Sequence, residues 1–152
     1  MATRRQTTRI VLQIVLGVVI VVLAYYLYLS ITEPYEAVRR EQELTRLTRD
    51  RMSDIRTALI RYELLYDHYP PTLDSLVAWI RQDSFMMAKA DSIFGPGFNL
   101  DSLIYSPRNG KFEYVVNDTG RVEIYYLKDP ASDDYIGSLE PDVTKLNAAS
   151  WE

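Results

Sequence analysis

Cysteine is absent from the chain, and histidine occurs only once in its 152 residues. The lack of cysteine excludes disulfide bonds, thiol catalysis, zinc–thiolate sites and iron–sulfur ligation. A single histidine excludes a histidine-rich metal site and leaves little for histidine-based acid–base catalysis. The 17 Lys and Arg residues stand against 21 Asp and Glu, a formal net charge of −4, which excludes a generally basic nucleic-acid-binding protein. No nucleic-acid partner is therefore expected.

Sequence signatures of common enzymes are missing as well. The chain has no phosphate-binding glycine loop, no G-x-S-x-G motif and no H-E-x-x-H motif. His68 follows Asp67 at the end of a predicted helix, and we interpret it as a residue that interacts with the helix dipole. The alternative role for His68 is a base that activates a nucleophile. The sequence thus predicts a protein that is not an enzyme and that needs no organic cofactor.

What the chain does contain is one long uncharged run, residues 10–31. As a helix these 22 residues would extend about 33 Å, enough to cross a hydrocarbon core of about 30 Å. The run is longer than the apolar part of a cleaved signal peptide. Its end carries Tyr25, Tyr26 and Tyr28, which suit the membrane–water interface. We therefore expect a permanent transmembrane helix, with the lipid bilayer as the first partner.

The charges that flank this run predict its orientation. Arg4, Arg5 and Arg9 precede it, and no acidic residue occurs before Glu33. By the positive-inside rule, residues 1–9 lie in the cytoplasm and the C-terminal domain is periplasmic. The sequence therefore predicts a single-pass protein of the cell inner membrane. Its outer part holds all 21 acidic residues and 14 basic ones (17 minus 3), so it should be repelled by anionic headgroups.

Residues 32–69 are predicted to form a stalk helix that continues into the next domain. Thr32 is suited to the N-cap and Pro34 to the first turn. The first half is dense in alternating charges, which is typical of a solvated helix or of one that packs on helices of neighbouring membrane proteins. From residue 52 onward, apolar residues at spacings of three and four predict one buried face. They are Met52, Ile55, Leu59, Tyr62 and Tyr66.

A globular part is predicted for residues 70–127, and it begins with a short helix. Thr72 is placed to cap this helix. The apolar face of the helix carries Leu73, Leu76, Val77 and Ile80. Residues 82–94 extend the helical pattern until Gly95-Pro96-Gly97 breaks it.

The pattern then changes to that of strands. Three short runs, residues 103–105, 111–116 and 121–127, are separated by Asn109-Gly110 and by Asp118-Thr119-Gly120. They predict an antiparallel meander with one apolar face. That face would carry Phe112, Tyr114, Val116, Val122, Ile124 and Tyr126. Because such a face needs helices as a cover, the predicted fold class is α+β.

The last segment, residues 128–152, is an acidic and weakly periodic C-terminal tail. Its acidic residues include Asp129, Asp133 and Asp134. Four apolar side chains would let the tail dock loosely on the domain: Leu139, Val143, Leu146 and Trp151.

The order of these elements resembles that of type II secretion pseudopilins and type IV pilin-like proteins. The likeness lies in residues 54–80, where a helix leads into a Tyr-Pro break and then into a Leu-x-x-Leu helix. The matching positions are Ala58, Leu59, Tyr62, Tyr69, Pro70, Leu73 and Leu76. The family's processing motif is missing, since no glycine precedes residue 10 and no glutamate lies within residues 10–31.

The long uninterrupted helix, the small outer domain and the lack of catalytic groups predict a non-enzymatic subunit of an envelope-spanning assembly, such as a secretion, motility or pilus-like machine. Such a subunit contacts other membrane-protein subunits, and copies of itself, through its stalk and its outer domain. Some pseudopilins also bind calcium in a C-terminal acidic loop, so the resemblance makes Asp129, Asp133 and Asp134 candidate calcium ligands. A solvated acidic loop is the alternative, because the spacing matches no EF-hand loop.

A second hypothesis for function belongs to another class. The protein would be a membrane-tethered module that binds or senses a small ligand or calcium outside the cytoplasm. This hypothesis predicts a pocket lined by tyrosines of the sheet, or stabilisation of the outer domain by calcium.

Overall fold

The computed structural model describes residues 2–140 and 142–152, without the side chains of residues 2–6, 32–34 and 143. The chain divides into two compact units, Met1–Glu43 and Leu44–Glu152. We call the first the N-terminal unit and the second the C-terminal unit. The fold of the C-terminal unit is α+β, as predicted, with helices and a three-stranded antiparallel sheet.

The N-terminal unit belongs to the long helix α1 (Ala2–Tyr66). Its uncharged run is helical throughout, and between residues 7 and 31 every side chain is exposed except that of Leu29, which is half-buried. The helix is long and apolar enough to cross a membrane, and it lies near the N-terminus, so it suggests a membrane anchor or a signal sequence. The prediction that Thr32 starts a separate helix is wrong, because α1 continues through residues 32–34. Pro34 removes a single N–H group from the hydrogen-bond ladder, and the helix continues beyond that loss.

In the C-terminal unit, the last turns of α1 form the predicted buried face. Met52, Ile55 and Leu59 are completely buried, and Ala58 beside them is buried too. The face weakens toward the helix end, where Tyr62 is half-buried and Tyr66 is exposed. The helix stops at Asp67, whose φ of 59° is left-handed and whose N–H donates to the Glu63 carbonyl over 2.7 Å.

Three short helices follow. Helix α2 (Leu73–Gln82) is capped as predicted by Thr72, which forms a reciprocal capping box with Ser75. The helical pattern predicted for residues 82–94 is divided into α3 (Ser84–Ala88) and α4 (Ala90–Ile93). The division begins at Asp83, because its carboxylate accepts the N–H groups of Phe85 and Met86 and so starts a new helix. Gly95 and Gly97, both with positive φ, end the helical region.

The sheet consists of β1 (Glu113–Asn117), β2 (Ile124–Lys128) and β3 (Tyr135–Gly137) in the order β1-β2-β3. Two of these strands correspond to predicted ones. The strand predicted at residues 103–105 is reduced to a single bridge between Tyr105 and Lys111, because the chain turns into the 3₁₀ helix η1 (Leu100–Ser102) just before it. The third strand instead comes from the segment that was predicted to be a loose tail.

Register decides which face of the sheet is buried. Tyr114 pairs with Leu127, and Val116 pairs with Tyr125, so these four side chains share the inner face. The predicted inner face is right for β1 and wrong for β2, where Tyr125 and Leu127 are completely buried. Of the residues predicted in their place, Ile124 is buried at the start of β2, Tyr126 is half-buried, and Val122 is exposed before the strand begins. Both alternating sets of β2 are apolar, so alternation alone does not distinguish them.

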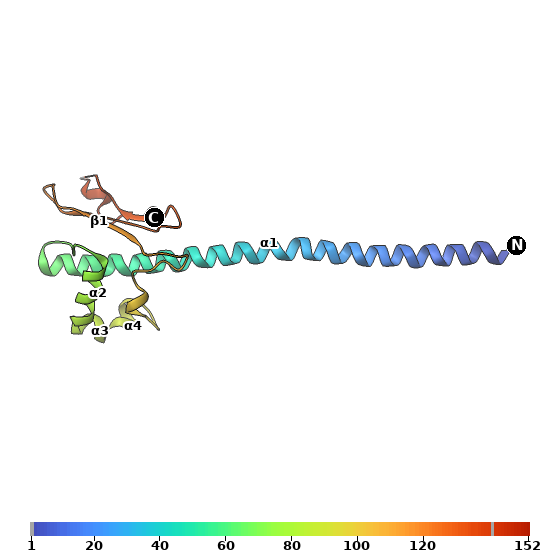
Figure 1. Ribbon diagram of the computed structural model, residues 1–152, viewed down its shortest axis with the longest axis horizontal. Helices are drawn as coiled ribbons and strands as arrows, with labels where there is room; N and C mark the ends of the chain where they lie inside the picture. Colours follow the sequence, from blue (N-terminus) through green and yellow to red (C-terminus); the bar gives the residue numbers. More distant parts are fainter. Residues whose placement is uncertain (1, 141) are drawn as a thin grey trace. The chain divides into compact units, whose positions relative to one another are not determined.

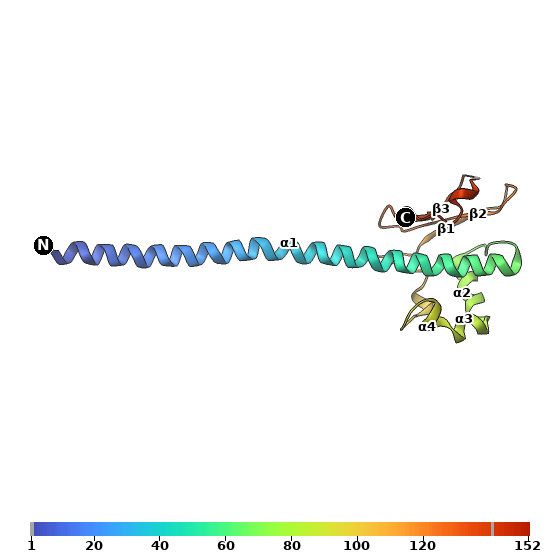
Figure 2. The same cartoon turned by 180° about the vertical axis from the view of Figure 1, so that it is seen from behind.

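The core of the C-terminal unit lies between the sheet and the helices. Figures 1 and 2 show the sheet on one side of the last part of α1 and helices α2 to α4 on the other. One continuous cluster joins side chains of α1, α2 and all three strands. Burial raises the pKa of the Tyr114 and Tyr125 hydroxyls, with smaller contributions from neighbouring groups, so both remain neutral.

The C-terminal segment is docked rather than loose. Ile136 is completely buried, and it forms a bridge with Ala149. Arg56 of α1 donates two hydrogen bonds to the Glu152 carboxylate, at 3.0 and 2.8 Å, and one to the Asn147 carbonyl. The 3₁₀ helix η2 (Val143–Lys145) lies in the connection between β3 and this docked end. Of the predicted docking residues, Trp151 packs against the core and Leu139 is exposed, while the side chain of Val143 lies outside the described residues.

Candidate functional site

The three predicted calcium ligands lie in the connection between β2 and β3, and the structure gives them different surroundings. Asp134 is buried and accepts two hydrogen bonds from the Arg49 guanidinium, at 3.1 and 3.0 Å. The same guanidinium lies 5.2 Å from the centre of the Trp151 ring. Asp134 is thus neutralised by α1, and the pair holds this connection against the helix.

Asp129 is completely buried, and its two carboxylate oxygens have no hydrogen-bond partner among the described residues. Only its main chain is engaged, with the N–H donating to the Asp134 carbonyl over 3.0 Å. A buried carboxylate without a partner carries a cost in free energy. The sequence had singled out Asp129 only as a candidate calcium ligand, and its burial is a finding of the structure.

Asp133 is exposed to solvent. Across residues 2–140 and 142–152, no three His, Asp or Glu side chains gather in a way that would hold a metal ion. Calcium binding in this connection stays a prediction, and in this geometry it would depend on Asp129, because Asp134 is occupied by Arg49.

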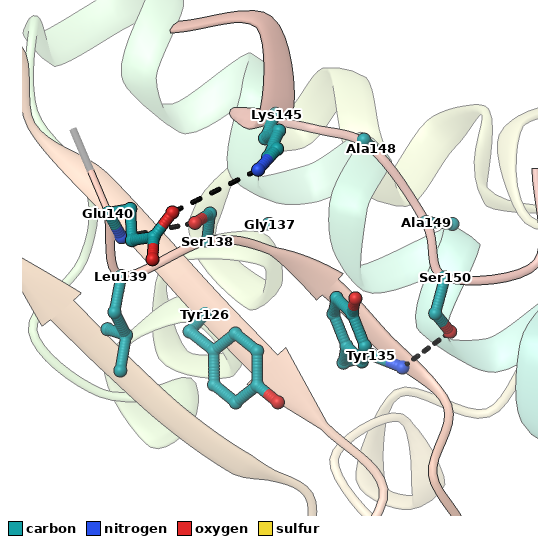
Figure 3. Close-up of a pocket in the computed structure, with 10 residues that line it drawn as sticks. All are labelled: Tyr126, Tyr135, Gly137, Ser138, Leu139, Glu140, Lys145, Ala148, Ala149 and Ser150. Atoms are coloured by element: carbon teal, nitrogen blue, oxygen red, sulfur yellow. Dashed lines mark hydrogen bonds and ion pairs between the residues drawn. The ribbon is translucent and has the colours of Figure 1, made fainter. Parts of the chain in front are cut away.

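A hollow lies on the outer face of the sheet, and we call it the outer pocket (Figure 3). Its volume is about 530 Å³. It is lined by β2, β3 and the segment that follows them: Tyr126, Tyr135, Gly137, Ser138, Leu139, Glu140, Lys145, Ala148, Ala149 and Ser150. A volume of this size is within the range of small-ligand sites.

The chemistry of the outer pocket combines two aromatic rings with one ion pair. The rings of Tyr126 and Tyr135 are tilted, with centroids 5.5 Å apart, and Figure 3 shows both along one wall. Lys145 and Glu140 are 3.9 Å apart across the other end. Such a site offers stacking and polar contacts to an aromatic or extended peptide group.

The second hypothesis from the sequence predicted a pocket lined by tyrosines of the sheet, but it did not locate the pocket. Tyr126 was placed on the inner face, and residues 137–150, which supply most of the lining, were taken as part of a tail. The remaining signal was the pair of adjacent tyrosines, Tyr125 and Tyr126, since two neighbours on a strand must face opposite sides.

A second hollow, also of about 530 Å³, lies between α1 and the Gly95–Gly97 loop. Asp50 and Asp54 of α1 line one side, and the stacked rings of Phe94 and Phe98 line the other. Burial raises the pKa of Asp54 to about 6, the charge of Asp50 adds to the rise, and the charge of Arg51 opposes it. This half-buried carboxyl group is thus held in its protonated form to a higher pH than an ordinary aspartate.

His68 belongs to an aromatic group at the end of α1. Its ring lies 5.5 Å from that of Tyr62 and 6.2 Å from that of Tyr66, and Tyr62 also contacts Trp79 edge-on at 5.1 Å. Nδ1 of His68 lies 3.1 Å from the Tyr69 carbonyl. His68 is thus an exposed residue in contact with aromatic rings, and neither its interaction with the helix dipole nor a role as a base is tested by this arrangement.

Comparison with models of protein families, with curated proteins and with solved structures found no match for this chain. The similarity to pseudopilins therefore remains one of shape, a long N-terminal apolar helix followed by a small antiparallel sheet.

Proposed function

We propose that the protein is a single-pass subunit of an envelope-spanning assembly, in which it acts through protein–protein contacts and not through catalysis. Residues 1–9 lie in the cytoplasm, α1 crosses the inner membrane, and the C-terminal unit is periplasmic. The assembly is of the kind that secretion, motility or pilus-like machines represent, and copies of the same chain are among the candidate partners.

The observation that carries this proposal is the exposed apolar surface of α1. Between residues 10 and 31 the helix has no charge, and nothing in its own unit covers its side chains. Exposing such a surface to water is unfavourable, whereas a bilayer solvates it. Within the bilayer the backbone must be helical, because lipid offers no hydrogen-bond partner for free N–H and C=O groups. Arg9, which is followed by no acidic residue before Glu33, supports the cytoplasmic N-terminus.

The C-terminal unit supports the role in assembly. The outer face of its sheet carries exposed apolar side chains at Val115 and Tyr135, and Leu139 just after β3 is exposed as well. A small domain that leaves an apolar sheet face in water is typical of a subunit with a partner.

Crosslinking in native membranes tests this function. Membranes from cells that express the tagged full-length chain are treated with an amine-reactive crosslinker and solubilised in mild detergent. The comparison is with cells that express residues 32–152 behind a cleavable signal and that receive the same treatment. We expect defined crosslinked species only for the anchored chain. A chain that stays monomeric in mild detergent and yields no crosslinked species would contradict the proposal.

The outer pocket favours a second function, a membrane-tethered module that binds a small ligand. Its two tyrosines and its ion pair provide the stacking and polar contacts that such a ligand needs.

In another version of this function the ligand is calcium. To test it, the melting temperature of the full-length protein is measured with calcium and with EDTA. An unchanged melting temperature removes calcium, and a shift that is lost in Asp129→Asn assigns it to the buried carboxylate.

A further inference from the structure

β1 is an edge strand, because the strand order β1-β2-β3 leaves one of its sides without a neighbour. We propose that this free edge accepts an extended segment of another polypeptide, which adds a fourth strand to the sheet. The inference rests on the proposed function and deepens it, since it names the surface and the conformation of the partner.

The direction of each main-chain group in β2 follows from its bonds to the next strand. The Tyr125 carbonyl accepts the Ser138 N–H at 3.1 Å, and Asp129 N–H donates to the Asp134 carbonyl, so residues 125, 127 and 129 face β3. Residues 124, 126 and 128 therefore face β1. Their partners in β1 are Asn117, Val115 and Glu113. The main-chain groups of Tyr114 and Val116 must then point to the free edge.

The free edge is short and well defined. At its start the Phe112 N–H donates to the Ile104 carbonyl over 3.0 Å, so the segment before the Asn109-Gly110 turn covers residue 112. The chain then leaves the edge at η1, before it reaches the level of Tyr114. Among the described residues, no hydrogen bond is found on the outward N–H or C=O of Tyr114 or Val116. Two donors and two acceptors are thus presented in a row, which is the pattern that strand addition uses.

The side chains beside this edge indicate what the added strand would contain. Val115 lies on the outer face and is 49% exposed. Glu113 is exposed on the same face and forms no ion pair among the described residues. An added strand places its alternate residues next to these two. The matching segment is therefore extended, with an apolar residue beside Val115 and a Lys or Arg beside Glu113.

A second copy of the chain fits this edge less well. Two β1 strands can pair antiparallel about a two-fold axis at Val115, with Tyr114 opposite Val116, and use all the free groups. That axis is perpendicular to the sheet, so it reverses the direction of the part of α1 that packs on the inner face. Two C-terminal units joined in this way would present their Leu44 ends in opposite directions, which does not suit anchors in one bilayer. We therefore assign the edge to a different polypeptide.

Amide hydrogen exchange on the purified full-length protein in detergent tests the geometry of the edge. Tyr114 and Val116 amides should exchange at least about tenfold faster than those of Glu113, Val115 and Asn117, which bond to β2. Equal protection of all five amides would mean that the edge is closed, and would overturn the proposal.

Thiol labelling in native membranes tests the occupant. Since the chain has no cysteine, Val115→Cys introduces the only thiol. We expect a maleimide to label it about tenfold more slowly in native membranes than in the purified protein. Val122→Cys, at a site of similar exposure (44%) in the loop after β1, is the matched control and should label equally in both. Equal labelling of Val115→Cys in both preparations would show a vacant edge.

Adding Val116→Pro to the Val115→Cys chain separates the edge from the face. Proline removes the outward N–H of residue 116 and leaves the bonds to β2 in place, so fast labelling should return. Folding of the double variant is checked by tryptophan fluorescence, since Trp79 and Trp151 both lie in the C-terminal unit. Protection that survives in the folded double variant would place the partner on the sheet face instead. If the proline variant does not fold, amide exchange of Tyr114 and Val116 is compared between native membranes and the purified protein. Slower exchange of both amides in membranes, together with slow labelling of Val115→Cys there, would support the proposal. Equal exchange in the two preparations would refute it.

Oxidation of the Val115→Cys membranes distinguishes the second copy. An antiparallel pair centred on Val115 brings the two Cα atoms to about 4.5 Å, within reach of a disulfide. A disulfide-linked dimer would overturn the assignment to a different polypeptide. Membrane association and crosslinked partners, by contrast, can persist while the edge proves vacant, so the failure of this inference is distinct from failure of the proposed function.

Discussion

At the scale of single residues, charged side chains of the C-terminal unit differ in how far they are removed from water. The Asp134 side chain is only 11% exposed and depends on Arg49, whereas the pair of Arg81 and Asp101 is largely solvated. Both pairs are close, at 3.0 and 2.7 Å, so distance alone does not rank them. Burial does, because a partner lost from a buried carboxylate is not replaced by water.

Arg49→Met should therefore lower the free energy of unfolding by about 2 kcal/mol, since it leaves the Asp134 carboxylate buried without its partner. Arg81→Met is the matched control and should cost less than about 0.5 kcal/mol. Urea unfolding followed by tryptophan fluorescence measures both. Equal costs for the two variants would contradict the dependence on burial.

A second prediction at this scale concerns Asp54, whose pKa is raised to about 6, mainly by burial. The folded state binds a proton more tightly than the unfolded chain, so stability should fall as the pH rises from about 4 to 6 and stay low above that. Asp54→Asn removes the buried charge and should stabilise the protein by about 1 kcal/mol at pH 7, a value discounted for the remaining solvent.

At pH 4, where the wild-type carboxyl is protonated in the folded protein, the two chains should melt at the same temperature. Thermal melting at the two pH values measures the difference. A stabilisation of equal size at both would show that the charge of Asp54 is not its cause.

At the scale of elements, the sequence predicted what depends on local spacing and missed what depends on distant pairing. The buried face of α1 and the cap of α2 at Thr72 follow from residues within a few positions of each other. The inner face of β2 does not, since Tyr125 and Tyr126 are equally apolar and only pairing with β1 separates them. β3 has three residues, too few to show alternation. The outer pocket was missed with it, because seven of its ten lining residues come after β3.

β3 also gives a sharp test of how the C-terminal segment is held. Gly137 has a φ of +83°, and a Cβ there would lie 2.2 Å from the Tyr125 carbonyl oxygen of the neighbouring strand. Gly137→Ala should cost well over 2 kcal/mol, because β3 has to move away from β2 in addition to the strain of positive φ.

Gly97→Ala provides the control for the backbone conformation. Its φ of +79° is similar, but a Cβ there would have nothing within 4 Å. This variant should cost only about 1–2 kcal/mol, the penalty of a left-handed residue. Chemical denaturation of both variants gives the difference, and similar costs would show that β3 has room to shift.

At the scale of the whole molecule, the two units differ in the surroundings that suit them. The N-terminal unit exposes the uncharged apolar run of residues 10–31, which lipid would solvate, whereas the C-terminal unit has its own core and a net acidic composition, which suit water. This combination fits the proposed anchor, which would place the chain at the boundary between lipid and water. Which side of the boundary holds the C-terminal unit depends on the charges that flank the apolar run.

The absence of cysteine allows this orientation to be measured directly with single introduced thiols. In spheroplasts, a membrane-impermeant maleimide should label Asp118→Cys, an exposed loop position, and should leave Ala2→Cys unlabelled. Permeabilising the membrane should make Ala2→Cys reactive, which confirms that its thiol is present and only shielded. Labelling of Ala2→Cys in intact spheroplasts would reverse the topology. A mature chain shorter than 17.6 kDa that lacks its N-terminus would instead identify the apolar run as a cleaved signal.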